Sequence, residues 1–558
     1  ADGHRPHTGS TALPSAGIDA TFLRRLLLQL EKAITKNQEL RVKYPDTPTR
    51  FMESEIALDQ ILYQFVDLAQ APQCYPDVVQ LGIIPSLLSL LSHENTDIAG
   101  RVVQILNEWT DEDVPANAAM EEQGSSEDDH SVDAVIQRQE RALQLTEHVR
   151  ALVATIVEHQ GLDLFVQNLA RLNSTNAEDQ QTVFATLGFI ENITTLDPQY
   201  AEVVVQRTKI VPWLLNQLQA RPFNSNVQYA SEILVILLQT SRRNRLRLGH
   251  IGGVDNLLQQ LAKYRRQDPA TDEELEYMEN LFDTLCSVLT EPELKLLFLQ
   301  SEGVELMVIM LRERRVSRSR ALKVLNYAVS SNQPISRMIV DRLLEASGLV
   351  PVLNVLMKKG LGKFKKAYKT FSESEEEEHT VCIVAALLKH TDPASASRWR
   401  IMRKFLDHDC ERVDRLVELH MDYTQKLRPI DQAIAQERAE LKASDTYDDG
   451  MEEDFYLRRM SSGLFTLQTV DTVLVYLGAE DTAIKTHAER LLKRQGKALD
   501  EVRTNVQEYI ANLGDEEAAE EIKAVSQSPA SDPESAPHIT NQTPNRQKQT
   551  LKQLLSVF

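Results

Sequence analysis

The chain has 558 residues, a formal net charge of −21 and 42% hydrophobic residues, which is ample for a large core. Its 20 glycines and lack of regular strand alternation argue against a β-rich fold. We find no apolar run of 18 residues and no signal-like segment near the start, so we expect neither a membrane span nor secretion. The acidic balance favours basic proteins and peptides over nucleic acid phosphates as partners.

The four cysteines are far apart in the sequence and mostly fall in helical patterns: Cys74, Cys286, Cys382 and Cys410. Their spacing matches neither a disulfide framework nor a zinc motif, so we expect an intracellular protein.

The first part of the chain predicts a helical cap. Residues 1–20 show no periodicity and are predicted to be a disordered lead. Residues 21–75 contain an amphipathic helix at Phe22–Ile34, two prolines that end it, and a second helix over Arg50–Ala69. An open stack of repeats needs such a cap to cover its first apolar face.

A repeat unit is recognisable at Leu81–Trp109. Gly82 interrupts a helix, and the residues after it place apolar side chains at the i, i+3, i+4, i+7 spacing of a buried helical face. After the polar turn Ser92–Asn95, either Asn95 or Thr96 is suited to cap a second, longer helix. A short helix, a polar turn and a longer helix are typical of an armadillo unit.

The same register recurs along the chain, at Gly161, Ile210, Gly253, Gly303 and Gly348. These starts are 49, 43, 50 and 45 residues apart, close to the armadillo and HEAT period of about 40–47 residues, and Gly82 precedes Gly161 by 79. We therefore predict an all-α, armadillo/HEAT-type right-handed superhelical solenoid over residues 76–390, with helical N- and C-terminal caps.

Two charged segments interrupt the predicted repeats. Residues 111–140 are rich in Asp and Glu and are predicted to be an acidic loop insertion. The loop is either a solvated spacer or a segment that attracts a basic partner. Residues 358–379 carry a lysine cluster followed by Glu373–Glu378 and are predicted to be a charged loop. RNA binding by the lysines is one interpretation, and pairing of the lysines with the neighbouring glutamates is the favoured one.

The remaining sequence predicts a C-terminal helical cap at 391–513, with long amphipathic helices over Val413–Leu427 and Glu453–Leu477. Residues 514–547 read as a disordered tether, and 548–558 as a terminal helix. Leu551, Leu554, Leu555 and Phe558 fall on one face of that helix, which we expect to pack on the C-terminal helices.

Several segments carry a more specific resemblance: KNQELR (Lys36–Arg41), FMESE (Phe51–Glu55), MENLFDTLCS (Met278–Ser287), SRSRALKVL (Ser317–Leu325), VDRLVELH (Val413–His420) and EEDFYLRR (Glu452–Arg459). Together they resemble the β-catenin-like family of nuclear armadillo proteins associated with the spliceosome, from about Phe22 to the end of the chain. The resemblance implies a nuclear, non-enzymatic scaffold in pre-mRNA splicing. It also implies partners that are basic, nuclear-signal-like segments of splicing factors, notably the Myb-related subunit of the Prp-nineteen-type complex.

An alignment of the long helices on their core leucines predicts a peptide-binding groove. Acidic and amide side chains suit Lys and Arg through charge-assisted hydrogen bonds. The alignment places six of them on the groove side of the helices: Gln104, Glu108, Asn192, Gln239, Glu279 and Asp283. The alternative is that these residues are solvated helix faces without a ligand.

An importin-α-like nuclear transport adaptor is the second hypothesis, because that family also grips basic peptides on armadillo repeats. Its tryptophan ladder is replaced here by Gln104, Gly188, Val235, Asp283 and Lys323, and only Asn192 matches the asparagine ladder. This pattern disfavours the adaptor.

An enzyme is disfavoured as well, because no phosphate-loop, dinucleotide, metalloprotease or nucleophile-elbow motif is present. His408, Cys410 and His420 lack a fourth ligand for zinc. We therefore expect no catalytic residues, metal or cofactor, no membrane association and no direct nucleic-acid binding. The sequence leaves homodimer formation open.

Overall fold

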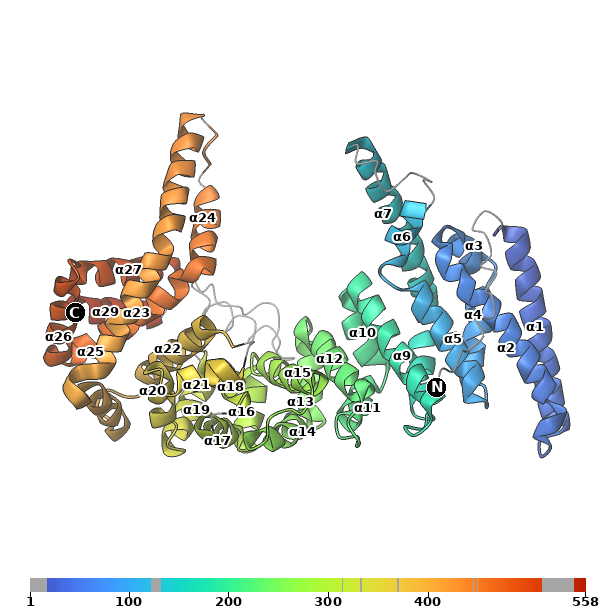
Figure 1. Cartoon of the computed structure of the whole chain (residues 1–558), viewed down its shortest axis with the longest axis horizontal. Helices are drawn as coiled ribbons and strands as arrows, with labels where there is room; N and C mark the ends of the chain where they lie inside the picture. The colour runs from blue at the N-terminus through green and yellow to red at the C-terminus, as the bar shows by residue number, and fades with distance from the viewer. Residues whose placement is uncertain are drawn as a thin grey trace, which may run out of the picture. The chain divides into compact units, whose positions relative to one another are not determined.

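The computed structural model of the chain describes residues 18–121, 132–313, 315–331, 334–368, 371–444, 446–448, 450–513 and 546–558. The predicted lead (apart from residues 18–20) and residues 514–545 of the predicted tether lie outside these ranges. Every regular element in the described residues is a helix (Figure 1), which confirms the predicted all-α solenoid class. The chain forms two compact units, Ala1–Leu261 with Pro269–Leu294 and Ala262–Asp268 with Lys295–Phe558. The predicted boundaries at 75, 390 and 513 stay predictions.

The first unit is built from fifteen helices within its described residues, joined by short turns and 3₁₀ segments. They are α1 (Ala20–Lys43), α2 (Met52–Val66), α3 (Tyr75–Gln80), α4 (Ile83–Ser89), α5 (Thr96–Trp109), α6 (Val114–Glu121), α7 (Val132–Glu158), α8 (Gly161–Leu169), α9 (Ala177–Leu196), α10 (Gln199–Arg207), α11 (Ile210–Gln217), α12 (Ser225–Gln239), α13 (Arg242–His250), α14 (Gly253–Leu261) and α15 (Asp272–Val288).

The second unit continues the helical pattern. After α16 (Pro292–Gln300), which begins in the first unit, it contains α17 (Gly303–Glu313), α18 (Ser317–Val329), α19 (Pro334–Glu345), α20 (Leu349–Leu356), α21 (Leu361–Ala367), α22 (Glu373–His390), α23 (Ala396–Ala443), α24 (Met451–Arg459), α25 (Phe465–Glu480), α26 (Thr482–Arg494), α27 (Leu499–Asn512) and α29 (Arg546–Val557). A π-helical turn at Met460–Leu464 joins α24 to α25.

The recurring glycines are needed at a sharp turn between two helices, which we call the helix elbow. A Cβ added to Gly161 would lie 2.5 Å from Ile156 Cγ2, and one added to Gly303 would lie 2.3 Å from the Phe298 ring. A Cβ added to Gly253 would lie 2.4 Å from the Leu248 side chain, and one added to Gly348 would lie 2.3 Å from the Leu343 side chain, which in each case is five residues earlier. A side chain at these positions would therefore push the two helices apart.

The residue just before each elbow glycine adopts left-handed backbone, with φ of 59° at Gln160 and 58° at Glu302. Gly82 has φ of 74° and open space around its Cβ position, so it corresponds to Gln160 and not to Gly161. The register assigned from the sequence is therefore wrong by one residue at the first repeat. There glycine supplies the left-handed conformation that other side chains disfavour.

The longer helices of successive repeats lie side by side. In the first unit α5 packs on α9, α9 on α12 and α12 on α15 (Figure 1). Each is started by a side chain that accepts a backbone N–H of the first turn, from Asn95, Asn176, Asn224 and Thr271. Of the two candidate caps for α5, Asn95 and Thr96, the structure shows that Asn95 is the cap.

The acidic insertion is more ordered than we predicted. Residues 114–121 form α6 and residues 132–140 belong to α7, so the loop prediction is wrong there, and residues 122–131 lie outside the described part. The helices form because α6 buries Ala118 and Ala119 against Leu145 of α7. This contact leaves little signal in the sequence, since alanine contributes little to an apolar pattern.

The charged loop prediction at 358–379 is also wrong, because α21 and the start of α22 occupy much of it. Three glutamates in the first turn of α22 suit the positive end of the helix dipole. The predicted pairing is confirmed: Lys358 Nζ lies 2.6 Å from Glu373 and 3.1 Å from Glu377, and Lys365 also pairs with Glu373. Two lysine hydrogen bonds, from Lys358 and Lys365, lower the pKa of Glu373 to about 2.

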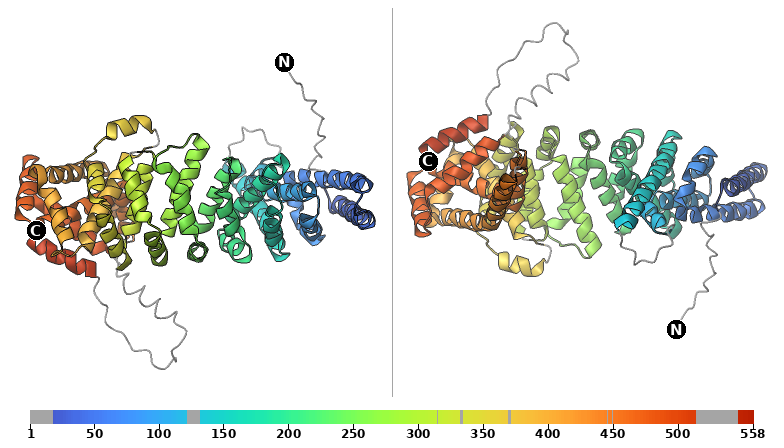
Figure 2. Two further views of the ribbon diagram at one scale, coloured as in Figure 1. Left: turned by 90° about the horizontal axis from the view of Figure 1, so that it is seen from below. Right: turned by 90° about the horizontal axis from the view of Figure 1, so that it is seen from above.

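The terminal helix α29 packs on α25 and α27 (Figure 2), as predicted. Leu551 and Phe558 are fully buried, whereas Leu554 and Leu555 are half-buried. The Phe558 ring lies against Gly478, where an added Cβ would be 2.5 Å from the ring. The backbone carbonyl of Val557 accepts a hydrogen bond from Lys485 Nζ at 3.1 Å.

In the described residues, no single helix is long and apolar enough to cross a membrane. One pair of helices, Pro72–Gln80 and Ile83–Ser92, is long and apolar enough when taken together, but the two are bent by 82°.

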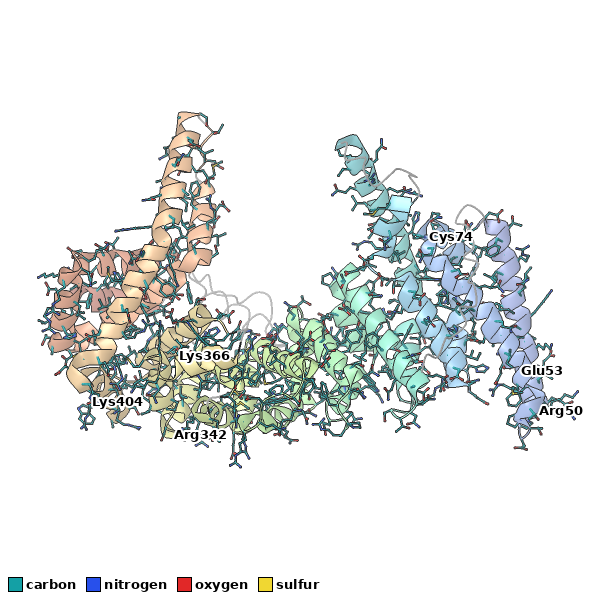
Figure 3. All side chains as sticks on the ribbon, viewed as in Figure 1. Arg50, Glu53, Cys74, Arg342, Lys366 and Lys404 are labelled. Carbon is teal, nitrogen blue, oxygen red and sulfur yellow. The ribbon has the colours of Figure 1, made fainter. Side chains whose placement is uncertain are left out.

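Cys74 lies buried within the helices of the first unit, while Arg50 and Glu53 lie exposed at the turn between α1 and α2 (Figure 3).

The packing of α29 on α25 and α27 leads to a prediction about stability. Phe558→Ala should lower the free energy of unfolding by about 3 kcal/mol, because it empties a buried aromatic site. Val557→Ala is the matched control, since Val557 is 63% exposed on the same helix. Thermal unfolding followed by circular dichroism should show a lower midpoint for Phe558→Ala alone. Equal midpoints for the two variants would mean that α29 contributes nothing to stability.

Candidate peptide-binding groove

The predicted groove residues of α5 lie on one partly buried face of that helix. Gln104 Nε2 donates to Glu108 Oε1 at 2.9 Å, and Gln104 Oε1 accepts from Arg101 Nη1 at 2.8 Å. Arg101 in turn pairs with Asp59 of α2 at 3.1 Å. The two predicted residues are therefore brought together, and Gln104 is tied into a chain of hydrogen bonds between α2 and α5.

Asn192 on α9 has a structural partner. Its Nδ2 donates to the backbone carbonyl of Asn107 at 3.0 Å, and it lies 3.4 Å from Asn107 Oδ1. Gly188 brings the same two helices together, since an added Cβ there would lie 2.7 Å from Asn107 Oδ1. The Asn192 amide thus joins α9 to the end of α5, and its role in peptide binding stays a prediction.

The remaining predicted residues lie on α12 and α15. Gln239 is exposed at the last position of α12. Glu279 and Asp283 lie one turn apart on α15, and both are half-buried and have partners within the protein. Their role in binding stays a prediction.

A row of carboxylates that the sequence analysis missed crosses the same helices. Glu191 of α9, Glu232 of α12 and Glu276 of α15 lie close enough that burial, with the charges of Glu191 and Glu276, raises the pKa of Glu232 above its usual value. We call these three residues the carboxylate row. Gln228 donates to Glu232 at 3.3 Å, and the Tyr229 hydroxyl donates to Glu191.

A signal for the carboxylate row was present in the sequence. Glu191, Glu232 and Glu276 recur 41 and 44 residues apart, close to the repeat period. Glu276 is also one helical turn before Glu279 and two before Asp283, on the same face of α15. A search for charged residues at the repeat spacing would have found the row.

A groove of about 940 Å³ lies beside the row, between α2, α5 and α9. Its floor includes Ile98, Arg101 and Gln104 of α5, and its walls carry Ile56 of α2 and Phe184 of α9. Phe184 packs on Tyr229 with ring centroids 4.7 Å apart, so the groove adjoins the carboxylate row at α9 and α12.

Metal chemistry has no candidate centre in the described ranges, where no three His, Cys, Asp or Glu side chains are arranged to hold an ion. His408 and Cys410 lie in a left-handed break of α23. His420 is fully buried, and its Nδ1 contacts Asp471 Oδ1 at 2.6 Å. Burial by itself would lower the pKa of His420, but the Asp471 charge and hydrogen bond raise it. His420 therefore serves the packing of α23 on α25.

The raised pKa of Glu232 predicts a pH effect on stability. A carboxyl whose folded pKa lies above its unfolded value contributes stability at low pH, and this contribution is lost as the pH rises through the folded pKa. At neutral pH, Glu232→Gln should therefore stabilise the protein slightly, by less than about 1 kcal/mol after screening. Melting curves at acidic and neutral pH should show the gain growing with pH. A destabilised Glu232→Gln protein at neutral pH would show instead that Glu232 is favourably paired.

Comparisons with known proteins agree with this architecture. Residues 7–507 match the family described as "Catenin-beta-like, Arm-motif containing nuclear". β-Catenin-like protein 1 of Homo sapiens is 36% identical over 501 residues, which cover 89% of this chain and 83% of the relative. The homologue of Schizosaccharomyces pombe is 30% identical over 514 residues, covering 91% and 82%.

Among solved structures, a designed armadillo repeat protein aligns with 53% of this chain and 97% of its own, at 15% identity and a TM-score of 0.33. That likeness is too weak to support the assignment, which therefore rests on the sequence matches. The match over nearly the whole length and the identity to relatives from human to fission yeast show that the chain belongs to the catenin-beta-like family of nuclear armadillo-motif proteins.

Proposed function

We propose that the chain is a non-enzymatic scaffold of the spliceosome, which works in the nucleus and binds basic, nuclear-signal-like segments of splicing factors. The partners are those that the family resemblance implies, notably the Myb-related subunit of the Prp-nineteen-type complex. The observation that carries the proposal is the carboxylate row, because its negative charges lie close together across three successive helices.

The electrostatics of the carboxylate row favour a cationic ligand. The charged groups that shift the pKa of Glu232 are two further carboxylates, so a Lys or Arg side chain placed among them would relieve their repulsion. Charge-assisted hydrogen bonds to such a side chain are roughly twice as strong as neutral ones. The three glutamates come from helices, so the contacts are organised before the peptide arrives.

The other acidic segment is less suitable as a binding site. In the run Glu373–Glu378, Glu376 is buried and receives two hydrogen bonds from Arg318 at 2.7 and 2.8 Å. Glu377 pairs with Arg415, and Glu378 accepts from Thr466 at 3.0 Å. These carboxylates already hold the helices of the second unit together, so they have little left to offer a partner.

Charge reversal tests the proposal. Glu232→Lys/Glu276→Lys should weaken binding of a labelled Lys/Arg heptapeptide by about tenfold or more, since it removes attraction and adds repulsion. Glu147→Lys/Glu158→Lys on α7 is the matched control, with the same change in net charge at exposed sites. Titrations at low and moderate salt should also show affinity falling with ionic strength, because exposed charges are screened over about 10 Å at 0.1 M salt.

The same variants test the partner class. Wild-type protein and the α7 control should recover the Myb-related splicing subunit from nuclear extract, and the Glu232→Lys/Glu276→Lys protein should recover less. Circular dichroism confirms that all three are folded. Equal peptide affinity for the two charge-reversed proteins would exclude the carboxylate row as the binding site. Recovery of import factors alone would contradict the role in splicing.

A further inference from the structure

Three large apolar side chains are exposed along the walls of the groove between α2, α5 and α9. Met52 and Ile56 lie one turn apart on α2 and are each 52% exposed, and Phe184 on α9 is 49% exposed. All three line the same groove. Exposed apolar groups gathered on one concave surface are typical of an interaction site, whereas scattered ones are ordinary.

The floor of the groove is held in place by close packing between α5 and α9. An added Cβ on Gly100 of α5 would lie 2.4 Å from Thr182 Oγ1 of α9, so only glycine allows these helices to approach so closely. On the other side, the Arg101–Asp59 ion pair joins α5 to α2. α5 thus forms a floor between two walls that are fixed to it.

Carboxylates are in excess around the apolar walls. Glu55 forms an ion pair with Arg41 and accepts a hydrogen bond from Asn95 Nδ2 at 3.2 Å. Asp59 forms an ion pair with Arg101. Asp97 and Glu178 also line the groove and are exposed. A partner that places cations near these two carboxylates would match the groove in charge.

Amide side chains on the floor are occupied within the protein. Asn95 caps α5 and donates to Glu55, Gln104 bonds to Arg101 and Glu108, and Asn107 Oδ1 lies 3.4 Å from Asn192 Nδ2. An extended peptide lying along α5 would have to compete with these bonds for partners to its backbone N–H and C=O groups. The other amides that line the groove, Gln60 and Gln181, are exposed on α2 and α9. A helix satisfies its own backbone and needs only apolar and charged contacts.

We propose that this groove binds an amphipathic helix of a partner protein, with aliphatic side chains packed between Met52, Ile56 and Phe184 and with Lys or Arg directed toward Asp97 and Glu178. This goes beyond the proposed function, in which the carboxylate row takes basic segments along α9, α12 and α15. The groove adds a second class of contact, one that depends on helical periodicity as well as charge.

Three model peptides of about eighteen residues and identical length separate the alternatives. The first carries leucines at i, i+4, i+7 and i+11, a spacing that places them on one face of a helix, and lysines flank the leucines. The second has the same composition in scrambled order. The third has two central prolines, which prevent helix formation. Binding to the full chain is measured by fluorescence anisotropy, and peptide helicity by circular dichroism.

We expect the first peptide to bind at least about tenfold more tightly than the other two and to gain helicity. Ile56→Ser/Phe184→Ser should reduce its affinity by about tenfold or more, because it removes two apolar contacts. Met338→Ser/Val350→Ser is the matched control: both residues are 50% exposed and lie outside the groove, and this variant should bind like wild type. The charge-reversed Glu232→Lys/Glu276→Lys protein should keep most of its affinity for the helical peptide, which separates this test from that of the proposed function.

Equal binding of the proline peptide, or no gain in helicity, would overturn the proposal in favour of an extended ligand. Equal binding of the scrambled peptide would show that charge alone is recognised. Sedimentation of the wild type and of Ile56→Ser/Phe184→Ser addresses self-association: a dimer that becomes a monomer in this variant would show that the groove is covered by a second copy of the chain.

Discussion

The arrangement of the helices depends on the contact made at the helix elbow. There a glycine lies against the side chain five residues earlier, with Ile156, Leu248, Phe298 and Leu343 in that position along the chain. A larger residue would open the angle between the two helices, and the displacement would pass to the longer helix that follows. Gly161 and Gly253 begin the short helices that precede α9 and α15, whereas Ile83 and Ile210 begin those that precede α5 and α12. The glycine contact therefore sets the angle at two of these four turns.

Glutamate has two distinct roles in this protein, and its neighbours decide between them. Glu376 is buried with Arg318, and loss of either partner would leave an uncompensated buried charge, which typically costs about 3–5 kcal/mol. Glu232 has the charges of Glu191 and Glu276 beside it, so its ionised form is disfavoured in the folded state. Ionised Glu232 therefore lowers the stability of the folded chain at neutral pH, whereas Glu376 is compensated by its partner Arg318.

The two surfaces of the first unit differ in what they offer a ligand. The carboxylate row presents charge, with Glu191 and Glu232 half-buried and Glu276 exposed. The groove between α2, α5 and α9 presents apolar side chains with carboxylates near them, while Asn95, Gln104 and Asn107 hydrogen-bond within the protein. The two proposals together assign recognition of charge to one surface and recognition of helical shape to the other.

The sequence by itself determined the features that depend on neighbouring residues in the chain. Helical periodicity predicted the repeats, and the cap of α5 was narrowed to Asn95 or Thr96. The predicted apolar face of α29 holds Leu551 and Phe558, which are buried, together with Leu554 and Leu555, which are half-buried. These could be read because a helix places residues three and four apart on one face, whatever surrounds it.

Only the tertiary structure decided which groups meet across helices. The Asn192–Asn107 bond, the Arg318–Glu376 pair and the carboxylate row each join residues at least 41 positions apart, so their meeting depends on how whole helices stack. The shift at Gly82 has a similar origin, since glycine is used for its left-handed backbone there and for close packing at Gly161. A sequence shows the same letter in both places, and only the surrounding backbone and side chains distinguish the two demands.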